Sequence, residues 1–145
     1  MATLLGIDYG TKRIGLAVGD EETRLPTPIK TIVESGPSRQ IQAVARVAEE
    51  YGATGFVLGL PLNMNDTEGP QAKTVRTFGD QLAAHTRKPV HYVDERLSSF
   101  AADDLLRGAE LTRKKKKGVQ DAVAATVILQ NYFQNADREA DDDRQ

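Results

Sequence analysis

Three acidic residues, Asp8, Glu95 and Asp121, stand next to apolar segments of the chain. Asp8 follows the apolar residues 4–7, and a carboxylate taken out of water is costly unless a cation or hydrogen-bond donors meet it. Several clustered carboxylates also repel one another and cannot all stay ionised unaided. Mg²⁺ or Mn²⁺ would compensate them, because hard divalent cations prefer oxygen ligands. We therefore predict that these three residues bind a metal ion.

The amino-terminal part of the chain predicts three strands in succession. Residues 4–8 are a short apolar strand, and residues 9–12 form a turn. Large apolar residues at 14, 16 and 18 alternate with small ones, which is the period of a second strand. Two early prolines in residues 26–33 suit an edge strand. Together these segments predict a three-stranded antiparallel meander.

Helices and strands alternate in the rest of the chain. Ser38 is the expected N-cap of a helix that ends at Gly52, and Pro70 suits the first turn of the next helix. The expected elements are, in order, a helix over 38–51, a strand over 55–61, a helix from 70, a strand over 90–93, a helix from 98 or 99 to 108, and a helix over 118–133.

This order predicts an α/β domain over residues 1–135, with a five-stranded mixed sheet and helices on both faces. Helical crossovers return the fourth and fifth strands parallel to the first. The carboxyl ends of these three strands then share one edge of the sheet, where α/β folds bind ligands. Asp8 and Glu95 lie at that edge.

Asp121 belongs to the last predicted helix. It shares one helical face with Ala124, Ala125, Ile128 and Tyr132, so we expect it to point toward the sheet. The alanines would allow the helix to approach the sheet closely. Asp121 should then meet Asp8 and Glu95 at one end of the fold.

Charge and composition limit the classes of protein that fit. The formal net charge is −2, and residues 136–145 contribute −3 of it through five acids and two arginines, which leaves +1 for residues 1–135. We expect the acidic tail to be disordered. The chain has no cysteine, which excludes disulfides and thiolate metal sites, and no apolar run long enough for a membrane span. These features favour a cytoplasmic protein without a membrane partner.

Four segments together resemble the YqgF/RuvX family of the ribonuclease H-like, Holliday-junction-resolvase-like superfamily. They read GIDYGTKRIGLAVGD, GLPLNMNDTEGP, VDERLSS and KGVQDAVAATVILQNYF, and they span nearly the whole chain before the tail. The resemblance implies a ribonuclease H-like fold and a Mg²⁺- or Mn²⁺-dependent phosphodiesterase, with Asp8, Glu95 and Asp121 as its catalytic triad. It also implies a nuclease that matures pre-16S ribosomal RNA in ribosome biogenesis, or alternatively one that resolves DNA junctions.

Basic and amide side chains near the acids are candidates for nucleic-acid contacts. Cations can neutralise phosphates, and amides suit backbone or sugar contacts. The candidates are Lys12, Arg13, Asn63, Asn65, Arg96, Lys114, Lys115, Lys116 and Lys117. The expected partners are RNA or structured DNA and ribosomal particles. A junction resolvase would need a symmetric dimer, whereas an RNA-processing enzyme could be a monomer.

Other interpretations of the same residues stay open. Asp121 could simply favour a helix start, Asp8 could cap the turn after it, and Glu95 could form a surface ion pair with Arg96. The residue three positions after Asp121 is Ala124, where related two-metal nucleases commonly have a fourth acid, so the number of metal ions is open.

Two other functions are also compatible with the sequence. The Asp-x-Gly-Thr turn at residues 8–11 fits actin-like nucleotide-binding proteins, although the chain has length for only one of their two domains. A non-catalytic RNA- or ribosome-binding module of the same fold is the second.

Overall fold

A computed structural model describes residues 2–63, 65, 67–94 and 121–135. Its labelled elements alternate between strands and helices after an initial meander. They are β1 (Thr3–Asp8), β2 (Arg13–Asp20), β3 (Thr27–Val33), α1 (Pro37–Tyr51), β4 (Gly55–Leu60), α2 (Pro70–Thr86) and β5 (Val90–Asp94). Residues 121–135 form a further helix, called here the C-terminal helix.

The five strands form one sheet in the order β3-β2-β1-β4-β5. β1 pairs antiparallel with β2, and β2 with β3, as expected for a meander. β4 returns parallel to β1, and β5 parallel to β4. The predicted mixed sheet is therefore confirmed. Its order brings the carboxyl ends of β1, β4 and β5 to one edge.

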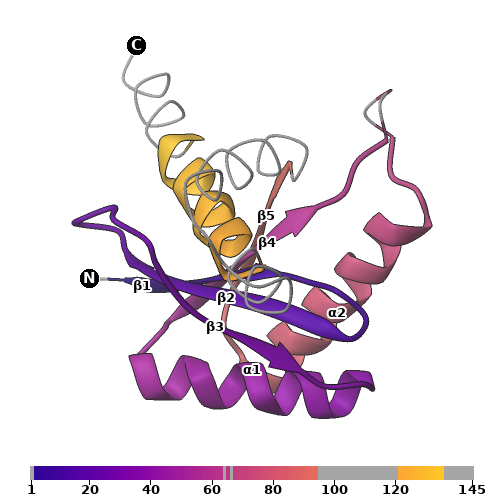
Figure 1. Ribbon diagram of the computed structural model, residues 1–145, viewed down its shortest axis with the longest axis horizontal. Helices are drawn as coiled ribbons and strands as arrows, with labels where there is room; N and C mark the ends of the chain where they lie inside the picture. Colours follow the sequence, from indigo (N-terminus) through magenta and orange to yellow (C-terminus); the bar gives the residue numbers. More distant parts are fainter. Residues whose placement is uncertain (1, 64, 66, 95–120, 136–145) are drawn as a thin grey trace, which may run out of the picture.

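Helices cover both faces of this sheet, as predicted (Figure 1). Alternate residues of the central strands, such as Leu5, Ile7 and Leu16, pack with α1 and α2 in the larger apolar core. Their neighbours face the opposite way, where Leu4 and Val57 pack against the C-terminal helix in a smaller core. This division follows from the period of two along a strand.

Proline begins both α1 and α2, and a glycine ends α1. α1 begins at Pro37 with Gly36 as its N-cap, so the prediction of Ser38 as the cap was wrong by two positions. Proline suits the first helical position because its fixed φ matches the helix and its missing N–H would have no partner there. Gly52 ends α1 in the left-handed conformation, and Pro70 begins α2, both as predicted.

Three glycines let the C-terminal helix lie almost on the backbone of β1 and β2. A Cβ atom at Gly6 would lie 2.7 Å from the carbonyl oxygen of Ala125, and one at Gly15 would lie 2.9 Å from Cβ of Asp121 and closer still to its carbonyl. At Gly19 it would meet side-chain atoms of Leu129. We call these three residues the glycine strip. A side chain at Gly6 or Gly15 would push the helix away from the sheet, because the added Cβ would meet helix backbone, whereas at Gly19 only side chains would have to shift.

A buried glutamine ties α1 to the turn between β1 and β2. The side chain of Gln40 is almost fully buried, and its Nε2 donates to the carbonyl oxygens of Thr11 at 2.9 Å, Glu34 at 3.0 Å and Gly10 at 3.3 Å. Loop carbonyls that leave water need such donors. Gln40 thus holds the segment that follows Asp8.

Some predictions fall outside the described residues. The expected helix from 98 or 99 to 108 and the acidic tail over 136–145 lie there, and both stay predictions. Within the part of the chain that the structure describes, no helix combines the length and the apolar character needed to cross a membrane.

We expect Gly15→Ala to lower the free energy of unfolding by about 1–3 kcal/mol, because its methyl group would overlap the backbone at Asp121. Gly19→Ala, on the same face of the same strand, is the matched control. Its methyl group would meet only side-chain atoms that can shift, so the loss should stay below about 1 kcal/mol. Urea denaturation measures both, and equal losses would contradict the close helix approach.

Gln40→Leu should lower the free energy of unfolding by about 1–3 kcal/mol, since it removes the shared donor from three backbone carbonyls. Gln42→Leu, two residues along α1 at an exposed position, should change it by no more than about 0.5 kcal/mol. Chemical denaturation of both variants distinguishes a buried clamp from a general effect of losing an amide on α1.

Candidate active site

Asp8 and Asp121 both lie next to Gly15 on the face of the sheet that carries the C-terminal helix. Asp8 ends β1, and its cross-strand partner on β2 is Gly15. Directly opposed residues of an antiparallel pair project to the same face. Because Asp121 lies against that face of Gly15, the two carboxylate-bearing residues flank one glycine. Two of the three predicted metal ligands therefore occupy one end of the fold.

Asp121 also has a cationic partner there. Nε of Arg13 donates to Oδ2 of Asp121 at 2.8 Å, across 108 positions of the chain. Both side chains are partly exposed, at 32% for Arg13 and 25% for Asp121. We had predicted Arg13 as a phosphate contact, but in this structure its guanidinium pairs with a predicted metal ligand.

The turn after Asp8 presents its two ends differently. Lys12, at the end next to β2, is exposed, and its cation can reach a phosphate. The ring of Tyr9 instead stacks on Phe78 of α2, with 4.4 Å between the ring centroids, and burial raises the pKa of its hydroxyl. Tyr9 therefore packs α2 against the sheet edge, and that ring face is not open for a nucleobase.

Asn63 and Asn65 lie in the loop between β4 and α2. Nδ2 of Asn63 donates to Oγ1 of Thr67 at 3.0 Å, and that hydroxyl donates to Oδ1 of Asn65 at 2.6 Å. The backbone N–H of Asn63 also donates to the carbonyl of Thr67, at 2.8 Å. These bonds close the loop on itself. Both amides are exposed, and their contact with nucleic acid stays a prediction.

The remaining predicted site residues lie outside the described residues. They are Glu95, Arg96, Lys114, Lys115, Lys116 and Lys117. β5 ends at Asp94, the residue before Glu95. Within the described ranges, no group of three or more His, Asp or Glu side chains could hold a metal ion. The third predicted ligand is thus not among the residues that the structure places.

A cleft of about 290 Å³ opens at the carboxyl ends of β1 and β4. Turn residues Tyr9, Gly10 and Thr11 form one side, while Gln71 and Thr74 of α2 are on the other. Its lining carries no formal charge. The cleft continues the sheet edge beyond Asp8 toward α2, so it can receive a neutral polar part of a ligand bound at that edge.

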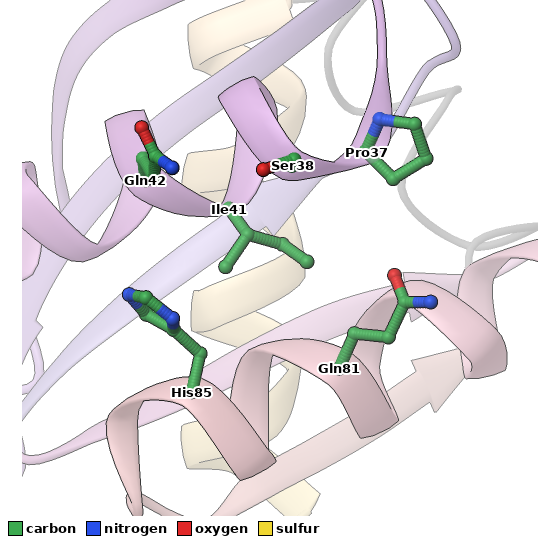
Figure 2. Close-up of a pocket in the computed structure, with 6 residues that line it drawn as sticks. All are labelled: Pro37, Ser38, Ile41, Gln42, Gln81 and His85. Atoms are coloured by element: carbon green, nitrogen blue, oxygen red, sulfur yellow. The ribbon is translucent and has the colours of Figure 1, made fainter.

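A second cleft lies between α1 and α2, away from the candidate site (Figure 2). It has a volume of about 470 Å³ and is lined by Pro37, Ser38, Ile41, Gln42, Gln81 and His85. Figure 2 shows Gln81 and His85 rising from α2 toward Ile41 of α1. No predicted site residue contributes to it, and its helices cover the opposite face of the sheet from Asp121. We do not assign the candidate chemistry to this cleft.

Two features of the site were missed from the sequence. Gly15 of the glycine strip was signalled by the alternation of large and small residues over 14–18, from which only a strand was predicted. Gln40 had no comparable signal, because a glutamine in a helix is usually exposed.

The buried face of the C-terminal helix was predicted only in part. Ala125 and Ile128 are buried as expected, but Ala124 is only partly buried, while Leu129 and Phe133 are buried as well.

The chain is similar to one known protein family over most of its length. The model of the RuvX family, described as Holliday junction resolvase, matches residues 2–135. A protein of Anaeromyxobacter dehalogenans named "Putative pre-16S rRNA nuclease" is 46% identical over 129 residues, which are 89% of this chain and 94% of that protein. One of the same name from Chloroflexus aggregans is 45% identical over 131 residues, or 90% of this chain and 92% of that protein.

Solved structures of junction resolvases share the fold. Thermus thermophilus RuvC, in complex with a Holliday junction substrate, superposes with a TM-score of 0.58 at 16% identity, covering 94% of this chain and 96% of that one. The fowlpox virus resolvase gives a TM-score of 0.57 at 14% identity, over 92% and 98% of the two chains. These likenesses confirm the predicted ribonuclease H-like fold class. By the family match over residues 2–135 and the close relatives, this chain belongs to the RuvX family.

Proposed function

We propose that this chain is a nuclease that hydrolyses phosphodiester bonds in the maturation of pre-16S ribosomal RNA. The observation that carries the proposal is that Asp8 and Asp121 flank Gly15 on one face of the sheet. Membership of the RuvX family and the names of its close relatives support the substrate. Carboxylates gathered at the carboxyl ends of strands are suited to metal-assisted phosphodiester chemistry.

The donors present fit a hard divalent cation. Asp8 and Asp121 supply carboxylate oxygens, and the Arg13 guanidinium already occupies one of them as a cation. We propose that Asp8, Asp121 and Glu95 hold Mg²⁺ or Mn²⁺. When bound, the metal would lower the pKa of a water molecule and stabilise charge on the phosphate. Glu95 as the third ligand is proposed from the sequence alone.

The chain's own residues would orient the nucleic acid around these acids. Lys12 is exposed at the β2 end of the turn that Gln40 holds, so its ammonium group can contact a phosphate beside the scissile one. We propose the same role for Arg96 and for the four lysines at 114–117. The cleft beside Tyr9 and Thr74 is uncharged and could receive a sugar or base of the same strand.

A second candidate function is the cleavage of four-way DNA junctions. The description of the matching family model, Holliday junction resolvase, favours it. Such an enzyme must cut two strands symmetrically and would therefore need a dimer with two active sites. The four-way junction in the substrate comparison below separates it from RNA processing.

We expect the purified protein to cleave a pre-16S transcript only with Mg²⁺ or Mn²⁺ and to stop when EDTA is added. Asp8→Asn and Asp121→Asn should each lower the rate by about 100-fold or more, because each removes a charged metal ligand. Asp80→Asn is the matched control, since Asp80 is exposed on α2 and should leave the rate unchanged. Gel analysis of the cleavage products measures the rates, and circular dichroism checks that each variant is folded.

Cleavage that persists in EDTA, or folded aspartate variants with the parent rate, would refute this site. The substrate is tested by offering the pre-16S transcript, an unrelated single-stranded RNA and a four-way DNA junction in parallel, with each metal. We expect the transcript to be cut fastest. A preference for the junction would assign resolution instead, and RNA binding without cleavage of any substrate would indicate a binding module.

A further inference from the structure

The ion pair between Arg13 and Asp121 engages a carboxylate that the proposed metal site also needs. Arg13 begins β2 and stands two residues before Gly15, so both project to the face of the C-terminal helix. Asp121 lies over Gly15, and Nε of Arg13 reaches its Oδ2 at 2.8 Å. The Asp121 carboxylate is therefore within reach of the Arg13 guanidinium and of any metal ion bound beside Asp8.

This ion pair is suited to being exchanged. Arg13 and Asp121 keep 32% and 25% of their side-chain surface exposed, and partly exposed ion pairs contribute little to stability. The bond uses Nε, which leaves further guanidinium N–H groups that can donate to another anion. Arginine is also the side chain best matched to bidentate phosphate binding. Arg13 can thus move between a carboxylate and a phosphate without leaving the site.

We propose that Arg13 is a built-in counter-ion that competes with the divalent cation for Asp121 and is drawn away by a substrate phosphate. This inference rests on the proposed function. Binding of a phosphate at Arg13 frees Asp121 for the cation, and binding of the cation at Asp121 frees Arg13 for a phosphate. By linkage the two affinities must rise together. The site would then acquire its cation most readily when nucleic acid is present.

Titration calorimetry with Mn²⁺ alone tests the competition. Arg13→Gln should bind Mn²⁺ at least about threefold more tightly than the parent protein, because the competing cation is gone. Lys12→Gln is the matched control, since it removes the same charge from the adjacent exposed position and should have a clearly smaller effect. Asp121→Asn should lose most of the affinity. Thermal melting of each variant checks that it is folded.

Calorimetry with a short 2′-O-methyl oligoribonucleotide, which resists cleavage, tests the coupling. The oligonucleotide should tighten Mn²⁺ binding to the parent protein by at least about threefold, and Arg13→Gln should lose this gain. Asp121→Asn with the oligonucleotide corrects for Mn²⁺ held by the nucleic acid itself.

Four results would overturn the proposal. Weaker Mn²⁺ binding by Arg13→Gln would mean that Arg13 orients Asp121 rather than competing for it. Equal changes in Arg13→Gln and Lys12→Gln would mean that only general charge matters. Unchanged affinity would mean that the ion pair does not compete, while the metal site of the proposed function would stand. A parent protein that binds no Mn²⁺ would instead refute that site and the competition together.

Discussion

The contact between the C-terminal helix and the glycine strip is the constraint on which the candidate site depends. A carboxylate on that helix can approach one on β1 only if the helix lies almost on the sheet backbone. Gly15 permits this at the point where the site forms, since even a methyl group there would overlap Asp121. Packing at the opposite end of the helix, by Leu129 and Phe133, holds the rest of the helix against the sheet.

The two faces of the sheet have different roles as a result. The face covered by α1 and α2 buries most of the large apolar side chains and supplies the larger core. The face covered by the C-terminal helix has small residues on β2. Its smaller core does not include Asp8 and Asp121, which lie at one end of this face. The larger core and the candidate acids thus lie on opposite faces of the same strands. The turn between β1 and β2 links the two faces. It follows Asp8, which lies on the face of the C-terminal helix, and it is hydrogen-bonded by Gln40 of α1, which covers the other face.

Electrostatics explains why a charge can follow the apolar strand β1. Asp8 is only partly buried, at the edge of the sheet, and the neighbouring acid Asp121 is met by Arg13. A cationic partner reduces the repulsion that two nearby carboxylates would otherwise have. Both side chains of this ion pair stay partly exposed to solvent. The fold therefore tolerates both acids without fully burying them, as the proposed cation site requires.

The sequence by itself determined the type and order of the described elements, because strand and helix periods, prolines and glycines act over a few residues. It also indicated Asp8 and Asp121, since each stands out against an apolar pattern. The partner of Arg13, the burial of Gln40 and the real N-cap of α1 followed only from the tertiary structure. The contacts of Arg13 and Gln40 join residues from 6 to 108 positions apart. Many side chains could in principle be their partners, and the local sequence pattern does not show which of these the packing of the fold brings within hydrogen-bond distance.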